Sequence, residues 1–135
     1  MEHIVTTQHN TGMQFTSDID NFSILMDSSE NGLPGGPSPK KLMLASLAGC
    51  TGIDVVSILT KMQVSYSEFS ITTIARLTTE HPKIYDNIKI IYKVKIDESN
   101  HQKFKRAVDL SIEKYCGVMA MYRHFAKIET EIVFL

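Results

Sequence analysis

The longest apolar stretch of the chain, residues 39–63, has hydrophobic side chains on nearly all sides of a predicted helix. Such a pattern is typical of a helix that is buried on most of its surface. Ser38 and Pro39 are residue types favoured at the N-cap and at the first helical position. A narrow polar stripe interrupts the apolar surface, because steps of three or four residues place its members on one helix face. The stripe consists of Ser46, Cys50, Asp54, Ser57 and Lys61.

Two later segments alternate between apolar and polar positions, and this period of two predicts half-buried strands. In residues 67–79 one face carries Phe69, Ile71, Thr73, Ala75 and Leu77. In residues 86–96 one face carries Ile88, Ile90, Tyr92, Val94 and Ile96. The segment EHPKIYD between them is predicted to join the two strands as a hairpin.

Shorter elements are predicted before the long helix. Strands are expected at residues 3–7, 13–16 and 22–26, and the last two are expected to turn through Asp20 and Asn21. Residues 28–39 are dense in Gly, Pro, Ser and Asn, which predicts a loop. This loop is long for a tight turn, so it is expected to cover part of a neighbouring surface.

The C-terminal third predicts a helix, a short second helix and a strand. Ser99 and Gln102 have the spacing of a capping box, and Gly117 is a typical helix stop. The intervening apolar side chains recur at helical spacing; they are Phe104, Ala107, Val108, Ile112 and Tyr115. Residues 126–134 predict a closing strand. This element order predicts a single α+β domain over residues 1–135.

Composition and charge limit the functional classes. The chain has 135 residues, 43% of them hydrophobic, which suffices for one domain with a core. Its net charge of −1 lacks the basic excess of a protein that binds nucleic acid or anionic membranes. The N-terminus lacks the features of a secretory signal, and Asp54 interrupts the only membrane-length apolar run, residues 42–59. We therefore expect a cytoplasmic protein without nucleic-acid or membrane partners.

The two cysteines, Cys50 and Cys116, are the candidate reactive groups. A permanent disulfide is uncommon in a reducing cytoplasm, which leaves two interpretations. Both thiols are buried as small hydrophobic groups, or they form a redox pair in which a sulfenic acid condenses with the second thiol. The stripe position of Cys50 and the adjacent Gly49 and Gly52 favour the redox pair. Asp54, one turn further on, disfavours a thiolate if it faces Cys50.

Metal and phosphate motifs are missing from the sequence. No two of the five histidines have the i, i+4 spacing of a helical metal site. Two cysteines are too few for a four-ligand zinc site without help from histidine. The glycines of LPGGPSP lack the spacing of a phosphate-binding loop. We expect neither a metal nor an organic cofactor.

Two segments together resemble the OsmC/Ohr family of small thiol proteins, and within it the YhfA-like branch. They are GGPSPKKLMLASLAGCTGIDVVSILTKM and KYCGVMAMY. The shared pattern is the helix start with its proline, a cysteine after a run of small residues, and a second cysteine after an amphipathic helix. The resemblance implies an OsmC-like fold in which central buried helices pack between antiparallel β-sheets. It also implies an intertwined homodimer with two sites at the subunit interface.

The resemblance further implies roles for the two thiols. By position, Cys50 corresponds to the thiol that reduces organic hydroperoxides and Cys116 to the thiol that resolves it. Peroxidases of the family pair an N-terminal arginine with a glutamate just after the helix-start proline. This chain has Lys40 at the glutamate position and no arginine before Arg76. Small residues around Cys50 are expected to let the central helices and a substrate approach closely.

Two functions from different classes therefore remain open. The first is a thiol-dependent peroxidase of the oxidative stress response, with an external thiol or dithiol reductant. The second is a non-catalytic OsmC-like module that binds a small hydrophobic or lipid-like ligand in an interface pocket. The missing arginine–glutamate pair favours the second function, and the retained cysteine pair favours the first.

Overall fold

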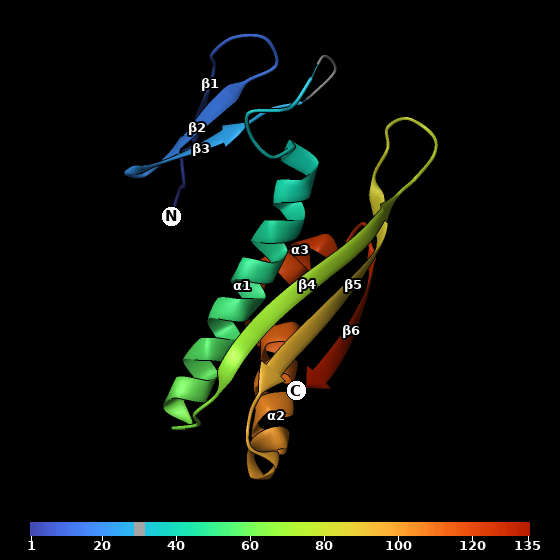
Figure 1. Ribbon diagram of the computed structural model, residues 1–135. Coiled ribbons are helices and arrows are strands. Elements are labelled where there is room, and N and C mark those ends of the chain that lie inside the picture. Colours follow the sequence, from blue (N-terminus) through green and yellow to red (C-terminus); the bar gives the residue numbers. More distant parts are fainter. Residues whose placement is uncertain (29–31) are drawn as a thin grey trace. The chain divides into compact units, whose positions relative to one another are not determined.

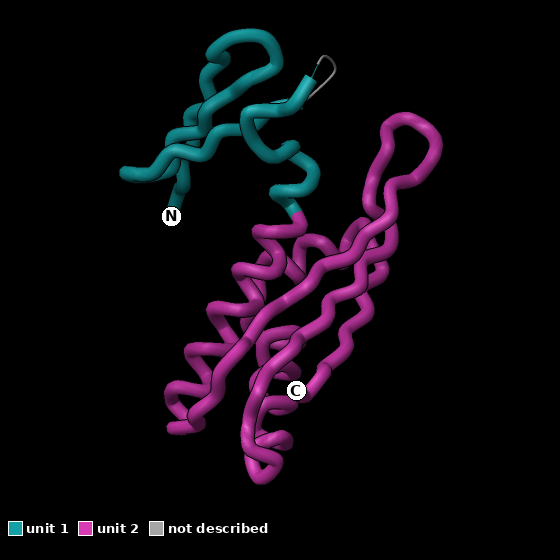
Figure 2. Tube along the Cα trace, viewed as in Figure 1, with its two compact units in different colours: residues 1–43 teal, residues 44–135 magenta. Residues whose placement is uncertain are grey.

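The computed structural model describes residues 1–28 and 32–135, which form two compact units, residues 1–43 and 44–135 (Figures 1 and 2). The first unit contains an antiparallel sheet of β1 (Thr6–His9), β2 (Phe15–Ile19) and β3 (Phe22–Met26). The expectation of a single domain over the whole chain stays a prediction.

The first two strands lie further along the chain than predicted, whereas the strand at 22–26 is confirmed. The reason is the turn between them, where the N–H of Asn10 donates to the carbonyl of Gln14 at 2.9 Å. Gly12, with a φ of 56°, allows the chain to reverse there. The predicted loop is confirmed at residues 32–38, and residues 29–31 of that prediction lie outside the described residues.

Helix α1 (Pro39–Lys61) begins where the sequence predicted. The Ser38 hydroxyl accepts a hydrogen bond from the N–H of Lys41 at 3.4 Å, as expected of an N-cap. The helix ends two residues before the predicted end, because Gln63 adopts a left-handed backbone with a φ of 57°. A residue in that conformation terminates a helix.

The second unit contains a sheet of β4 (Ser67–Leu77), β5 (Tyr85–Lys95) and β6 (Lys127–Phe134). The predicted hairpin of β4 and β5 is confirmed as an antiparallel pair. Strand β6 lies parallel to β5, so the expectation of purely antiparallel sheets is wrong for this sheet. The helices between β5 and β6 form the long crossover that a parallel connection requires.

Helices α1 and α2 (His101–Leu110) contribute to one core with the inward face of β5. The core includes Leu47, Val55, Leu59, Ile88, Ile90, Tyr92, Val94, Phe104, Ala107 and Val108, all at most 1% exposed. Full burial of one such Leu, Ile or Val side chain contributes about 1.5–3 kcal/mol. The unit therefore has a sheet with helices packed on one face, as the period-two pattern of β5 predicts.

The end of α2 differs from the prediction. A short π-helix, η2 (Ser111–Tyr115), follows α2, and α3 (Gly117–Tyr122) follows directly. Gly117 starts α3, so its predicted role as a helix stop is wrong. The wider π turn displaces Tyr115 from the apolar stripe, and this side chain is 53% exposed.

The predicted capping box before α2 is also wrong. Asp97 accepts hydrogen bonds from both the N–H and the hydroxyl of Ser99, each at 3.0 Å. This arrangement caps the short 3₁₀ turn η1 (Glu98–Asn100), which precedes α2. The Asp97 side chain therefore performs the capping that the sequence assigned to Ser99.

Helix α1 is long and apolar enough to cross a membrane when only its length and composition are considered. The core helix of a soluble protein meets the same criterion, and α1 buries Leu47, Val55 and Leu59 in the core of its unit. Asp54 of α1 also accepts a hydrogen bond from Ser111. These contacts favour the interpretation of α1 as a core helix.

Candidate functional site

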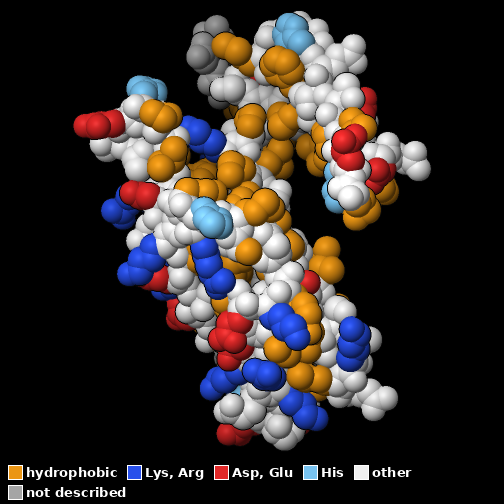
Figure 3. Space-filling view, turned by 180° about the vertical axis from the view of Figure 1, so that it is seen from behind, with side chains coloured by type: hydrophobic (Ala, Val, Ile, Leu, Met, Phe, Trp, Pro, Cys, Tyr) orange, Lys and Arg blue, Asp and Glu red, His pale blue; other side chains and the backbone are white. Residues whose placement is uncertain are grey.

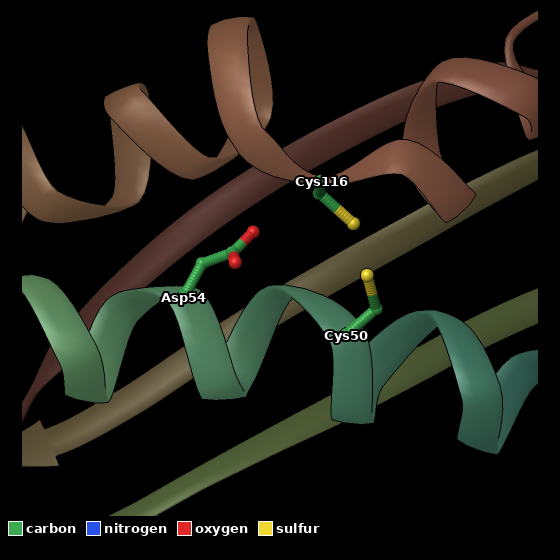
Figure 4. A group of neighbouring side chains, drawn as sticks. All are labelled: Cys50, Asp54 and Cys116. Atoms are coloured by element: carbon green, nitrogen blue, oxygen red, sulfur yellow. The ribbon is translucent and has the colours of Figure 1, made fainter. Parts of the chain in front are cut away.

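The two cysteines meet although they lie far apart in the sequence. Cys50 lies half-buried on α1, and Cys116 lies between η2 and α3 with 4% of its surface exposed. Figure 4 shows the two sulfurs pointing toward one another, with the carboxylate of Asp54 beside them. The two sulfurs and a carboxylate oxygen of Asp54 all lie within 4.8 Å of one another. Both thiols are free, so the predicted pair is brought together without a disulfide.

The π turn places Cys116 at this position. Its N–H donates to the carbonyl of Ser111 at 2.9 Å, and its backbone then becomes extended with a ψ of 100°. Its sulfur accepts a hydrogen bond from the N–H of Met119 at 3.4 Å, which caps the start of α3. Cys116 is therefore fixed by two hydrogen bonds, one donated by its own N–H and one accepted by its sulfur.

The environment of Cys116 disfavours its thiolate. Burial raises the pKa of the Cys116 thiol to about 11, and the hydrogen bond from the Met119 N–H opposes this shift. The neighbouring Cys50 and Asp54 raise this pKa further. Cys116 therefore remains a protonated thiol near neutral pH.

A chain of buried hydroxyl groups leads to the third member of the cluster, Asp54. Ser111 donates to the carboxylate of Asp54 at 3.0 Å. Because a serine hydroxyl has one proton, Ser111 accepts in its 2.8 Å contact with Thr51. By the same count, Thr51 accepts in its 2.8 Å contact with Tyr92. The donors therefore run in the order Tyr92, Thr51 and Ser111, and the carboxylate of Asp54 is the final acceptor.

The phenol of Tyr92 is suited to begin this chain as a donor. Burial raises the pKa of Tyr92 to about 12, so the phenol stays protonated at physiological pH. Tyr92 lies on β5, Thr51 on α1 and Ser111 at the start of η2. These hydrogen bonds therefore tie three elements together and fix the carboxylate of Asp54.

The two glycines beside Cys50 have different surroundings. A Cβ atom added at Gly52 would lie 3.1 Å from Cδ1 of Ile71, so the absence of a side chain allows β4 to approach α1. A Cβ atom added at Gly49 would have no neighbouring atom within 4 Å. Both glycines line an open apolar groove of about 650 Å³ together with Ala48, Ile53, Val56, Ser57, Phe69, Ser70 and Ile71.

Three members of the polar stripe of α1 border a second cavity, of about 380 Å³. Asp54, Ser57 and Lys61 line this cavity. Ile58, Met62, Leu110 and Tyr115 complete it. Asp54 thus borders both the cavity and the two thiols.

The sequence identified some members of the site and missed others. Cys50, Cys116 and Asp54 were singled out, and the structure brings them together. Thr51, Ser111 and the hydroxyl of Tyr92 were not assigned to the site. The only sequence signal for them is polar groups on otherwise apolar helix and strand faces. Lys40, which occupies the position of the family's glutamate, lies exposed in the first turn of α1.

The fold and the thiol pair together define a class of small α+β thiol proteins. The sequence profile of the OsmC-like protein family matches residues 30–131. The chain therefore belongs to the OsmC-like family, and the resemblance seen in the sequence is confirmed. Protein YhfA of Escherichia coli (strain K12) is 36% identical over 98 residues, which cover 73% of this chain and 72% of that protein.

Solved structures agree with this assignment. The crystal structure of a hypothetical protein from Aquifex aeolicus VF5 is similar with a TM-score of 0.87 and 27% identity, covering 100% of this chain and 97% of that one. The Organic Hydroperoxide Resistance Protein OhrB of Bacillus subtilis has a TM-score of 0.69 and 16% identity over 98% of each chain. The second similarity shows the shared fold. The OsmC-like fold class is therefore confirmed.

Proposed function

We propose that this protein reduces organic hydroperoxides, with Cys50 as the nucleophile and Cys116 as the resolving thiol. The observation that carries the proposal is a pair of free thiols with sulfurs within 4.8 Å in an OsmC-like fold. A structural relative from Bacillus subtilis bears the name organic hydroperoxide resistance protein, which supports this substrate class.

The first step forms a sulfur–oxygen bond at Cys50. Its thiolate attacks the terminal oxygen of R–O–O–H, the O–O bond breaks, and the electron pair leaves on the alkoxide. The alkoxide takes up a proton and departs as the alcohol. Cys50 has then been oxidised by two electrons to sulfenic acid, and the peroxide has been reduced by two electrons.

Differences in burial support this order of reaction. Cys50 is half-buried, whereas Cys116 is 4% exposed and therefore poorly accessible to a peroxide. The pKa of Cys116, raised by burial to about 11, also keeps most of this thiol protonated near pH 7. Because the thiolate is the attacking form, Cys50 is the better first nucleophile.

The second step forms the disulfide. The sulfur of Cys116 attacks the sulfenic sulfur of Cys50, an S–S bond forms, and the hydroxyl group leaves as water. Burial is the main cause of the raised pKa of Cys116, but Cys50 also contributes through its charge and its hydrogen bond. Oxidation to a neutral sulfenic acid removes the charge contribution and so assists the second step.

An external thiol or dithiol then reduces the disulfide by two successive exchange reactions and is itself oxidised. We further propose that the protein acts as a homodimer, as the family resemblance implies, and in the cytoplasm, as expected from its sequence. No resident metal or organic cofactor is required for these steps, because the electrons come from the two thiols and the external reductant.

Stopped-flow mixing of the reduced protein with cumene hydroperoxide tests this proposal. The unmodified protein is expected to consume about one equivalent of peroxide and to form a Cys50–Cys116 disulfide, detected by peptide mass mapping. Cys50→Ser is expected to react no faster than buffer alone. Cys116→Ser is expected to consume one equivalent and stop at a sulfenic acid that a dimedone probe traps.

Two results would contradict the proposal. Failure of both thiols to oxidise in excess hydroperoxide would exclude the activity. Rapid reaction of Cys50→Ser, with an inert Cys116→Ser, would reverse the roles of the two thiols.

The apolar groove beside Gly49 favours the alternative function of a hydrophobic-ligand module. If the groove binds a ligand without chemistry, both cysteine variants should retain the affinity of the unmodified protein for a fluorescent fatty acid. Loss of that affinity in both variants would count against this alternative.

A further inference from the structure

We infer that Cys50, Asp54 and Cys116 together form a binding site for a divalent transition metal of the zinc class. The two sulfurs and one carboxylate oxygen lie within 4.8 Å of one another (Figure 4). The inference is independent of hydroperoxide reduction, because it concerns the affinity of the reduced side chains for a cation.

The geometry needs only small adjustments to hold such an ion. With Zn–S bonds of about 2.3 Å, a tetrahedral zinc ion places two sulfur ligands roughly 3.8 Å apart. The observed limit of 4.8 Å exceeds this value by an amount that side-chain rotation can supply. Cys50 and Asp54 are one turn apart on α1 and share a face, so one rigid helix supplies two of the three ligands.

The chemistry of the donors selects the class of ion. Two thiolates and one carboxylate suit zinc and similar borderline metals, whereas magnesium and calcium prefer oxygen ligands alone. Three protein ligands leave a fourth tetrahedral position for water, as in zinc sites that remain open. Because thiols must lose their protons to bind, one Zn²⁺ ion displaces protons from both cysteines.

The charge balance of the cluster also favours a cation. Among the described residues, ion pairs join Lys89 to Glu131 and Lys127 to Glu129. Neither of these pairs involves Asp54. Asp54 is half-buried and lies beside two thiols. Where an acidic group loses contact with water, a paired charge or a metal ion compensates its charge. A divalent ion supplies that compensation here.

Neighbouring donors already orient two of the three ligands. Ser111 donates to the carboxylate of Asp54 at 3.0 Å, and the N–H of Met119 donates to the sulfur of Cys116 at 3.4 Å. Such outer hydrogen bonds fix ligand orientation, and their loss typically weakens metal affinity by about 10–100-fold. Ser111 is itself fixed by Thr51 and Tyr92, so the carboxylate is held by buried structure.

Metal binding and disulfide formation exclude each other because they use the same two sulfurs. If the proposed function holds, a hydroperoxide releases the ion. Two zinc-bound thiolates, one R–O–O–H molecule and two protons then give one disulfide, one alcohol, one water molecule and free Zn²⁺. This consequence rests on the proposed function, whereas binding itself does not.

The test is titration of the reduced, metal-free full-length protein with Zn²⁺ and, in parallel, with Co²⁺ under anaerobic conditions and without peroxide. We expect one ion per chain from competition with a chromophoric chelator, and thiolate-to-cobalt charge-transfer absorption. Cys50→Ser and Cys116→Ser should each lose stoichiometric binding. Ser111→Ala should bind about 10–100-fold more weakly, because it removes a hydrogen bond that orients Asp54.

Asp54→Asn should weaken Zn²⁺ binding at least as strongly, since an amide is a poorer ligand than a carboxylate. Asp109→Asn, at an exposed aspartate of α2, is the matched control and should bind like the unmodified protein. Circular dichroism checks that each variant is folded. A second readout is the degree to which bound Zn²⁺ protects Cys50 from an alkylating reagent.

Absence of stoichiometric binding in the folded, reduced protein would overturn the inference. Unchanged affinity in folded Asp54→Asn would also overturn the three-ligand site. Peroxide is added in a separate step, to reduced protein that holds no metal. Binding without reaction would therefore refute the proposed function and leave the metal site standing, and reaction without binding would do the opposite.

Discussion

At the scale of single residues, the site depends on hydroxyl groups as much as on thiols. Thr51 is fully buried and joins Tyr92 on one side to Ser111 on the other, with both contacts at 2.8 Å. A buried hydroxyl without a partner loses its hydration without replacement, so the middle member of such a chain has the greatest effect on stability.

The middle position of Thr51 in this chain of hydroxyl groups gives a prediction for two conservative substitutions. Thr51→Val removes both contacts and leaves the buried phenol of Tyr92 without its acceptor, so the free energy of unfolding should fall by about 1–3 kcal/mol. Tyr92→Phe removes only one contact and should cost about 0.5–1.5 kcal/mol. Urea unfolding of the reduced proteins measures both values.

The double variant is the control for this interpretation. Once the phenol is absent, Thr51→Val strands no buried donor, so the combined cost should be smaller than the sum of the single costs. Strict additivity would show that the two hydroxyl groups do not act together.

At the scale of secondary structure, the junction between α2 and α3 determines where the second thiol lies. The π-helix η2 turns Ser111 inward toward Thr51 and ends at Cys116, whose sulfur caps α3. π turns inside helices are frequent at functional sites. Here the turn moves one side chain into the hydrogen-bonded chain and the next cysteine into contact with α1.

The capping contact predicts different stabilities for two replacements of Cys116. Cys116→Ala leaves the N–H of Met119 without its acceptor and should lower the free energy of unfolding by about 1 kcal/mol. Cys116→Ser retains an acceptor at the cap and should lose clearly less. Urea unfolding of both reduced variants makes the comparison, and equal losses would show that the capping hydrogen bond does not contribute.

At the scale of the whole molecule, the first unit has little interior of its own. Within the described part of residues 1–43, only Ser17 is buried, and Phe22 of β3 is 74% exposed. In the second unit, Ile53 of α1 is 73% exposed at the edge of the apolar groove. Figure 3 shows basic, acidic and apolar side chains interspersed over one face of the molecule. A three-stranded sheet without a covered apolar face is only marginally stable, so we propose that a partner covers these surfaces.

We propose that this partner is a second copy of the chain, as the family resemblance implies. Sedimentation equilibrium is expected to give a homodimer for the unmodified protein. Ile53→Lys should shift the equilibrium toward monomer, because a charge is costly to bury in an apolar interface. Ile53→Leu is the matched control and should remain dimeric. A monomeric unmodified protein, or an unaffected Ile53→Lys variant, would contradict this assignment of the interface.

The sequence by itself determined the features that depend on local order. The start of α1, the two long strands and their inward faces follow from periodicity and capping preferences that involve neighbouring residues. The two cysteine segments were sufficient to place the chain in its family, because both are short contiguous patterns. The position of Asp54 one turn from Cys50 also follows from helix geometry alone.

Only the tertiary structure decided what depends on contacts between distant residues. Thr51 and Ser111 are 60 positions apart, and no local pattern states that they bond. The parallel pairing of β6 with β5 and the π turn before Cys116 depend on how the helices between them pack. Periodicity specifies which face of an element is buried, but it does not specify what that face contacts. The meeting of Cys50, Asp54 and Cys116 is therefore a property of the packed core.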